Sequence, residues 1–203
     1  MKSIPERLSG PELVVYAAKF IFDRYLTDTA GGNISLREGE MVYFSPTMAG
    51  TNYHWKISAE DVITGSIHDL DALNEHPRFT REGFSHIAIY KTFPYVQAIL
   101  HAHPKYINPF VAQSKPIPPV LNSSKHFGTL QYHEEAKSYS QDQADKIVKV
   151  FKTQEDRIKK KAAAVLMPQH GLILASMDMM VALDCLERIN NNAFAVLAQK
   201  WID

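Results

Sequence analysis

Four stretches of the chain carry apolar residues at the three- and four-residue spacing of amphipathic helices. We predict helices over residues 9–26, 80–93, 140–151 and 178–201. Ser9 with Glu12 and Ser140 with Gln143 have the spacing of a capping box, in which side chains bind the free backbone N–H groups of a first turn. The first and third helices therefore have defined starting points, and Pro94 ends the second.

Short apolar runs bounded by turn residues predict the strands. These runs cover residues 34–36, 41–44, 96–101, 163–167 and 172–175. The segment 37–40 reads as a hairpin turn, and 168–171 separates the last two strands. We expect a loop around Pro46 and Gly50, and a short helix that starts at Ser58. Hairpins outnumber strand–helix–strand units, so the pattern predicts an α/β fold with a central, largely antiparallel sheet covered by helices.

Three of the nine histidines close apolar runs. His101 and His103 follow one run in the order His-Ala-His-Pro, and His170 follows another, just before Gly171. Because residues two apart in a strand point to the same face, His101 and His103 can bind one cation. If the two strand ends converge, three imidazoles form the ligand set of a catalytic zinc site, although iron, nickel, cobalt or manganese also fit. The alternative is that each histidine is a hydrogen-bonded loop residue.

Glu82 and a glycine-rich turn each allow a structural and a functional reading. Glu82 lies at the start of a predicted helix, where it can act as a cap or as a partner of the helix dipole. Beside a metal it would instead serve as a general base or a further ligand. The run Gly31-Gly32-Asn33 can be a plain turn, or its amides can hold an anion.

Composition and charge narrow the class of protein. The chain has 203 residues, of which 45% are hydrophobic and 22% charged, so we expect one globular domain over residues 1–203. Its net charge is zero, which argues against a nucleic-acid binder. The single cysteine, Cys185, excludes an intramolecular disulfide and fits a reducing compartment. The sequence shows neither an apolar run long enough to span a membrane nor the pattern of a secretory leader, so we expect a cytoplasmic protein with no membrane partner.

Five segments together resemble the class II aldolase/adducin family. The first is Thr29-Ala30-Gly31-Gly32-Asn33-Ile34-Ser35, similar to the family's phosphate loop, and the second is Ser45-Pro46-Thr47. Arg81-Glu82 followed by His86, Ile89 and Tyr90 resembles the family's Ser-Ser-Glu helix. The last two are Ala98-Ile99-Leu100-His101-Ala102-His103-Pro104 and Gln169-His170-Gly171-Leu172. Their order and spacing cover nearly the whole chain.

The resemblance implies a three-layer α/β/α fold and a complete site. It implies a divalent metal, Zn²⁺ or alternatively Mn²⁺, Co²⁺ or Fe²⁺, bound by His101, His103 and His170. It implies that Glu82 abstracts or returns a proton. It implies a substrate anion, usually phosphate, held near Gly32, Asn33, Thr47, Thr80 and Arg81. It also implies a homo-oligomer, most often a tetramer with active sites between subunits.

The function implied is a metal-dependent aldehyde-lyase that cleaves a small phosphorylated sugar through a metal-stabilised enediolate. Two departures from the family pattern bear on this: Thr80-Arg81 replaces a pair of serines, and Asn122 stands where some aldolases carry a tyrosine acid. Protonation then falls to Glu82, to water, or to a residue such as Tyr132 or Tyr139. The alternatives are a decarboxylase or epimerase on the same site, an iron-dependent oxygenase, and an adducin-like binding module without catalysis.

Overall fold

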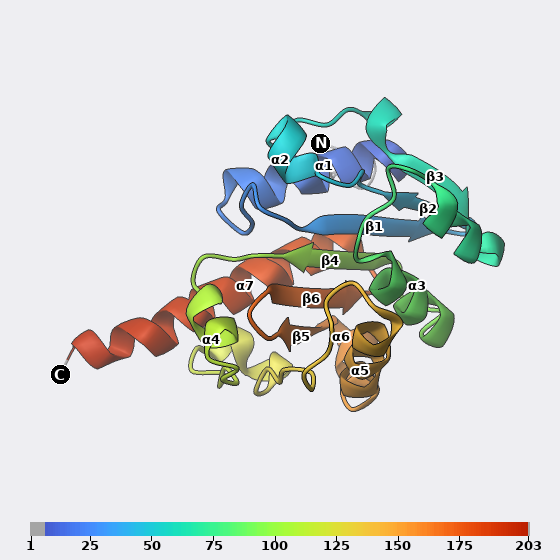
Figure 1. The fold of residues 1–203 in the computed structure, drawn as a ribbon. Helices are drawn as coiled ribbons and strands as arrows, with labels where there is room; N and C mark the ends of the chain where they lie inside the picture. The colour runs from blue at the N-terminus through green and yellow to red at the C-terminus, as the bar shows by residue number, and fades with distance from the viewer. Residues whose placement is uncertain (1–6, 203) are drawn as a thin grey trace.

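A six-stranded antiparallel sheet forms the centre of the computed structural model, which describes residues 7–202 (Figure 1). The strands lie in the order β3-β2-β1-β4-β6-β5. Their bounds are β1 Asn33–Glu38, β2 Met41–Phe44, β3 Ile63–Ser66, β4 Ala98–Ala102, β5 Ala162–Met167 and β6 Gly171–Ser176. Every pair of neighbouring strands is antiparallel, which confirms the predicted largely antiparallel sheet.

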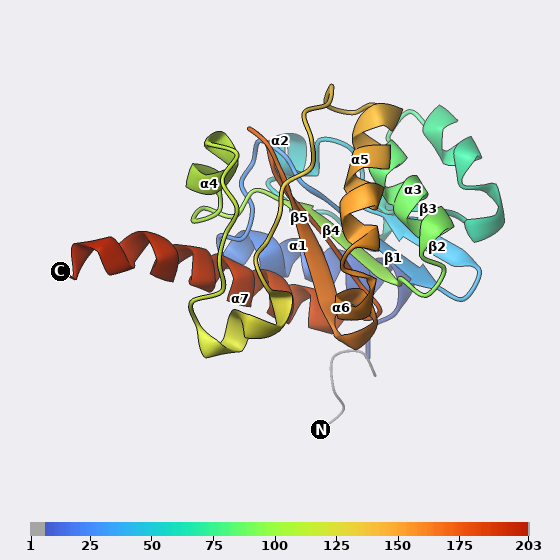
Figure 2. The same ribbon diagram turned by 90° about the horizontal axis from the view of Figure 1, so that it is seen from below.

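Helices cover both faces of this sheet and make the three layers (Figure 2). On one face lie α1 Gly10–Asp23 and α7 Met179–Ala198, and on the other α3 Gly83–Thr92, α5 Gln141–Lys152 and α6 Glu155–Lys160. Two short helices, α2 Ala49–Tyr53 and α4 Asn108–Ala112, lie in the connections. Of the helices that the structure describes, none has the length and apolar character to cross a bilayer.

Alternating side chains of the inner strands feed two separate hydrophobic cores. Leu100 of β4 and Leu174 of β6 join the core under α1 and α7, whereas Ile99 and Ile173 join the core under α3 and α5. Every residue of β4, β5 and β6 is buried, and apart from His101 and Ser176 these strands contain only apolar residues and glycine. His101 follows the Ile99 alternation and therefore faces the α3 side of the sheet.

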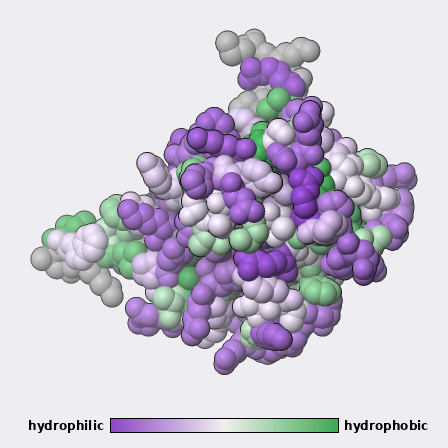
Figure 3. All heavy atoms as spheres, turned by 45° about the horizontal axis from the view of Figure 1, so that its top comes forward, coloured by the Kyte–Doolittle hydropathy of each residue, from purple (hydrophilic) through white to green (hydrophobic). Residues whose placement is uncertain are grey.

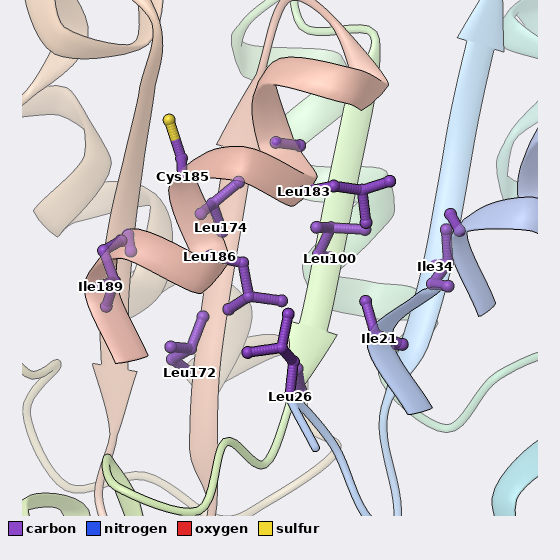
Figure 4. Close-up of a cluster of buried hydrophobic side chains, with 14 of the residues drawn as sticks. Ile21, Leu26, Ile34, Leu100, Leu172, Leu174, Leu183, Cys185, Leu186 and Ile189 are labelled. Carbon is purple, nitrogen blue, oxygen red and sulfur yellow. The ribbon is translucent and has the colours of Figure 1, made fainter. Parts of the chain in front are cut away.

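The end of α7 extends beyond the sheet, and exposed apolar residues lie on it and on the short 3-10 turn Gln199–Trp201 that follows (Figure 3). Phe194 is 43% exposed, Trp201 77% and Ile202 85%. The rest of α7 is packed into the core, where Leu183, Leu186 and Ile189 contact the sheet (Figure 4). The C-terminal segment thus has a buried part, in α7, and an exposed apolar end.

Several predicted elements differ from the observed ones. A strand absent from the prediction, β3, forms the edge of the sheet, and the expected loop around Gly50 contains helix α2. The Ser9 capping box is wrong, because Ser9 makes no side-chain cap and the Gly10 N–H binds Glu38 Oε2 instead. Helix α3 starts at Gly83, so Glu82 is its N-cap residue and Thr80 lies in the preceding turn.

Asn192 ties α7 to the loop that follows α4. Its Oδ1 accepts hydrogen bonds from the backbone N–H of Val120 and Leu121 and from Ser124 Oγ, at 2.8, 3.1 and 2.6 Å. Its amide nitrogen donates to Pro118 O at 2.9 Å. Asn192 is 3% exposed, so the groups that it binds are shielded from water and would be left without partners if its side chain were removed.

We expect Asn192→Ala to lower the free energy of unfolding by about 3 kcal/mol, because several buried polar groups lose their partner. The neighbouring Asn191 is exposed, and Asn191→Ala serves as the matched control, with an expected change within about 0.5 kcal/mol. Urea denaturation of the two variants measures both values. Equal losses in both would contradict a special role for Asn192.

Candidate functional site

Three imidazoles meet where β4 ends and β6 begins. His101 lies in β4, His103 two residues later, and His170 directly before β6. Their ring centroids lie 5.0 Å apart for His101 and His103, 4.7 Å for His101 and His170, and 5.1 Å for His103 and His170. Each offers a ring nitrogen within 4.8 Å of the others, so the predicted convergence of the strand ends is present, and the cluster could hold a metal ion.

The hydrogen bonds of His101 and His103 leave one nitrogen of each ring free. His101 Nδ1 donates to the backbone oxygen of Leu172 at 2.9 Å, and His103 Nδ1 lies 3.3 Å from Asp28 Oδ1. In neutral rings of this tautomer both Nε2 atoms carry lone pairs, yet these atoms are only 3.3 Å apart. Two nitrogen ligands of a tetrahedral zinc ion lie about 3.3–3.4 Å apart, because each Zn–N bond is about 2.0–2.1 Å long. The donor set therefore fits a divalent cation.

Burial favours the neutral form that a metal ligand needs. Burial is the main reason that the pKa of His101 lies well below its ordinary value, and the neighbouring His170 and His103 lower it further. The pKa of His103 is also lowered by burial, against the opposing charge of Asp28. Burial lowers the pKa of His170 to about 4, with help from the charges of His103 and Arg81. At neutral pH all three rings carry a free lone pair.

Two glycines make room for the ring of His103. A Cβ atom on Gly31 would lie 2.5 Å from His103 Cε1, and one on Gly171 would lie 2.7 Å from His103 Cδ2. Both distances are shorter than any normal contact between carbon atoms. Gly31 and Gly171 thus have a steric role at this site. This role does not decide whether the Gly31-Gly32-Asn33 segment is a plain turn or binds an anion.

Glu82 approaches the cluster from the α3 side. Its side chain is 1% exposed, and Oε1 lies 3.6 Å from His170 Nδ1. Both atoms are buried and neither has a hydrogen-bond partner, which is unusual for polar atoms in a protein interior. Burial raises the pKa of Glu82 to about 7, opposed by a hydrogen bond from Ser85 and by the charge of Arg81. A carboxyl group with this pKa can both accept and return a proton near neutral pH.

A small pocket opens over the cluster. Its lining includes eight of the nine predicted site residues: Gly32, Asn33, Thr47, Thr80, Arg81, Glu82, His101 and His170. The ninth, His103, is not among the lining residues, but its Nε2 lies 3.3 Å from that of His101, and 10% of its side chain is exposed. The Thr80 hydroxyl accepts the backbone N–H of Glu82 at 3.3 Å, which gives Thr80 a local structural role as well.

Tyr139 also lines the pocket, and it is placed there by a strained backbone. Its ring lies 5.7 Å from that of His170, and the Arg81 guanidinium lies over it at 4.8 Å. Its φ of 63° is in the left-handed region, as are those of Met48 at 59° and Gln169 at 56°, which line this pocket or the adjoining cavity. Non-glycine residues in this region are costly and often gather at functional sites.

Sequence reasoning missed one contributor to the site and left another unresolved. Asp28, which orients His103, is 75 residues away in the chain and belongs to an ordinary turn sequence. Tyr139 is only one of the two tyrosines that the sequence offers as proton donors. The available signal for it is its position directly before the Ser140 cap of α5, where its N–H donates to Gln143 Oε1 at 2.9 Å.

The chain matches a known family over most of its length. Residues 12–197 match the family described as the Class II Aldolase and Adducin N-terminal domain. The chain belongs to this class II aldolase family. The match confirms the resemblance derived from the five segments and agrees with the observed three-layer fold.

The curated relatives that match this chain are L-fuculose phosphate aldolases. An L-fuculose phosphate aldolase of Methanococcus maripaludis is 29% identical over 97 residues, which cover 48% of this chain and 51% of the relative. The matched region thus spans about half the length of that relative. An L-fuculose phosphate aldolase of Methanocaldococcus jannaschii is 24% identical over 167 residues, 80% of this chain and 81% of the relative.

Solved structures show the same fold. An L-fuculose 1-phosphate aldolase superposes with a TM-score of 0.77 at 21% identity and covers 100% of this chain and 90% of its own. The L-fuculose-1-phosphate aldolase of Thermus thermophilus superposes with a TM-score of 0.72 at 14% identity, over 93% of each chain. At these identities the likeness concerns the fold alone.

We expect His103→Ala to lose most bound metal at neutral pH, because two nitrogen ligands hold a divalent ion far less tightly than three. The measurement is metal content per chain after dialysis against metal-free buffer. His68→Ala is the control, since the His68 side chain is 71% exposed and remote in sequence from the cluster. Full occupancy in the His103 variant would remove this residue from the ligand set.

Proposed function

We propose that this chain is a metal-dependent aldolase, an aldehyde-lyase that cleaves a small phosphorylated sugar. The observation that carries the proposal is the buried carboxyl group of Glu82 at the edge of three converging, neutral imidazoles. The family and the names of its curated relatives support the reaction class. Zinc as the metal, a cytoplasmic location and one functional domain over residues 1–203 are parts of the same proposal.

His101, His103 and His170 would hold the metal. A divalent ion bound there would act as a Lewis acid toward the oxygen atoms of the substrate and stabilise the negative charge that develops when the carbon–carbon bond breaks. The chain's own contribution is to keep the three rings neutral and fixed. Leu172 O and Asp28 fix two of the rings through their Nδ1 atoms, which is the usual way that proteins orient histidine ligands.

Glu82 would move the proton of the reaction. Cleavage of an aldol requires a base that takes the proton from the hydroxyl group beside the breaking bond, and an acid that returns a proton to the released fragment. Glu82 Oε1 is free of hydrogen bonds and faces His170, so it is available for this proton. A bound cation would lower its pKa from the value of about 7 that burial gives, which keeps the base form populated at neutral pH.

Arg81 and the residues around it would hold the anionic group. The guanidinium lies over the Tyr139 ring, and Asn33, Thr47 and Gly32 line the same pocket. Arginine binds phosphate or carboxylate through two parallel hydrogen bonds, and stacking on an aromatic ring limits its motion. This arrangement supports a substrate anion as the anchor that positions the reacting carbons.

The remainder of the substrate would extend toward a second cavity. This cavity, of about 480 Å³, shares Tyr139 and His170 with the pocket and is otherwise lined mainly by polar side chains, among them Gln143 and Gln169. Its size suits a small polyhydroxylated molecule. Since Tyr139 lies at the boundary of the two spaces, it is the tyrosine best placed to donate a proton to the departing fragment.

We predict that Glu82→Gln lowers turnover of a sugar phosphate by about two to four powers of ten, because the shape is kept and the proton acceptor is lost. The test is steady-state cleavage over a panel of phosphorylated and unphosphorylated sugars and sugar acids. Glu75→Gln is the control, since Glu75 is exposed. Unchanged turnover in the Glu82 variant would exclude it from the reaction, and loss of the folded state would support a purely structural role for Glu82, whose side chain makes no cap hydrogen bond to α3.

We predict that Arg81→Ala raises the Michaelis constant strongly for an anionic substrate and hardly at all for its neutral analogue. Each charge-assisted hydrogen bond contributes about 1.5–3 kcal/mol, so the loss of one corresponds to an increase of at least about ten-fold. Matched phosphorylated and unphosphorylated substrates measure the difference. Equal increases on both would show that Arg81 does not contact the anion.

We propose a homotetramer as the assembled form. The exposed apolar residues at the end of α7 and just beyond it, Phe194, Trp201 and Ile202, support a contact between copies of the chain. We expect light scattering at micromolar concentration to give four times the mass of one chain, and Phe194→Asp to lower it. A monomer in the wild type would contradict this proposal without affecting the metal site.

A further inference from the structure

A chain of hydrogen bonds runs through the buried space between β1 and α3. His86 Nε2 lies 2.6 Å from Asn33 Oδ1, and His86 Nδ1 lies 2.7 Å from Ser35 Oγ. Ser35 Oγ lies 2.9 Å from the hydroxyl of Tyr90, which is 3.5 Å from the backbone oxygen of Gln97. His86 and Ser35 are fully buried, and Tyr90 is 2% exposed. The proposed proton transfer and metal binding use none of these three side chains.

The protons of this chain can be arranged in two directions. In one, Tyr90 donates to Ser35, Ser35 donates to His86 Nδ1, and His86 Nε2–H donates to Asn33. In the reverse direction, the Asn33 amide is turned over and donates to His86 Nε2, Nδ1–H donates to Ser35, and Ser35 donates to Tyr90. Tyr90 must then donate to the backbone oxygen of Gln97. The first direction uses only bonds of 2.6–2.9 Å, whereas the second depends on the contact of 3.5 Å, which is too long for a good O–H···O bond.

We propose that His86 is a positioning residue, which holds the Asn33 amide with its oxygen inward and its N–H groups toward the pocket. Asn33 lines that pocket, and with Oδ1 bound to His86 the amide nitrogen is the group that it can offer there. The side chain then presents donors only, so it favours a group that only accepts hydrogen bonds, such as an ionised phosphate.

The placement of Asn33 makes this orientation consequential. Asn33 is the register partner of His101 across the β1–β4 pair, so the sheet fixes the position of its backbone relative to the histidine cluster. Only the rotation of the side-chain amide then has to be set. A freely rotating amide would present its oxygen to the anion part of the time, which repels it. The orientation of Asn33 follows from the hydrogen bonds alone, while its role toward a substrate rests on the proposed function.

The tautomer of His86 is the direct test. We expect long-range proton–nitrogen correlation spectra of the zinc-loaded, ¹⁵N-histidine-labelled protein to show His86 protonated on Nε2, with the signal identified by its loss in His86→Gln. Protonation on Nδ1 alone would overturn the proposal, because the Asn33 amide would then have to donate to Nε2.

Inorganic phosphate tests the consequence for the pocket. We expect Ser35→Ala to weaken phosphate binding, measured by calorimetry, by at least about ten-fold, because Nδ1 loses its donor and the tautomer is no longer fixed. Tyr90→Phe keeps the packing and should weaken phosphate binding, but less than Ser35→Ala does. Tyr95→Phe is the same change outside the chain of hydrogen bonds and should leave phosphate binding unchanged. Metal content and melting temperature must match the Tyr95→Phe control, which separates positioning from a general loss of structure.

Each result bears on one hypothesis. Unchanged phosphate affinity in folded Ser35→Ala and Tyr90→Phe would overturn the positioning role. If Ser35→Ala fails to fold, the Tyr90→Phe comparison decides alone. Failure to cleave any sugar phosphate, with Nε2–H and phosphate binding as expected, would refute the proposed aldolase and leave this inference intact. Cleavage with an Nδ1–H tautomer would do the reverse.

Discussion

The contact on which this site depends is the bond from His101 Nδ1 to the backbone oxygen of Leu172. Both residues lie in strands that are buried throughout, where an unsatisfied imidazole would be costly. His101 is opposite Ile173 in the β4–β6 register, so the carbonyl of the adjacent Leu172 is within reach without any distortion of the sheet. One hydrogen bond therefore satisfies the ring, selects its tautomer and directs Nε2 toward His103 and His170.

The parts of the site that could be predicted are those encoded locally. The spacing of His101 and His103 places both rings on one side of a strand end, and a His-Gly sequence at a hairpin brings His170 to the same edge. These are consequences of strand periodicity and antiparallel pairing, which a sequence expresses directly. Half of the Ser140 capping box is confirmed, since the Ser140 hydroxyl binds the Gln143 N–H three residues later, whereas the Gln143 side chain accepts from the Tyr139 N–H and not from that of Ser140.

The parts that could not be predicted depend on contacts distant in sequence. Ser9 and Glu12 have the spacing of a capping box, but the Ser9 side chain makes no cap, and a first-turn N–H, that of Gly10, is bound by Glu38 of β1, which is distant in sequence. Strand β3 is missing from the prediction because only Ile63 within it and Ile67 just beyond it are strongly apolar, as is common at a sheet edge. Asp28 and Tyr139 reach the site through turns, for which sequence periodicity carries no information.

The electrostatics of the pocket link the anion to the base. The charge of Arg81 lowers the pKa values of both Glu82 and His170, against the effect of burial on the first and together with it on the second. An anion paired with Arg81 would screen that charge, and the pKa of Glu82 would then rise toward the value that burial alone favours. The carboxyl group would hold a proton more tightly once the substrate is anchored than before. A bound metal ion would act in the opposite sense, so in the proposed reaction the pKa of Glu82 would depend on the balance between the charge of Arg81 and that of the ion.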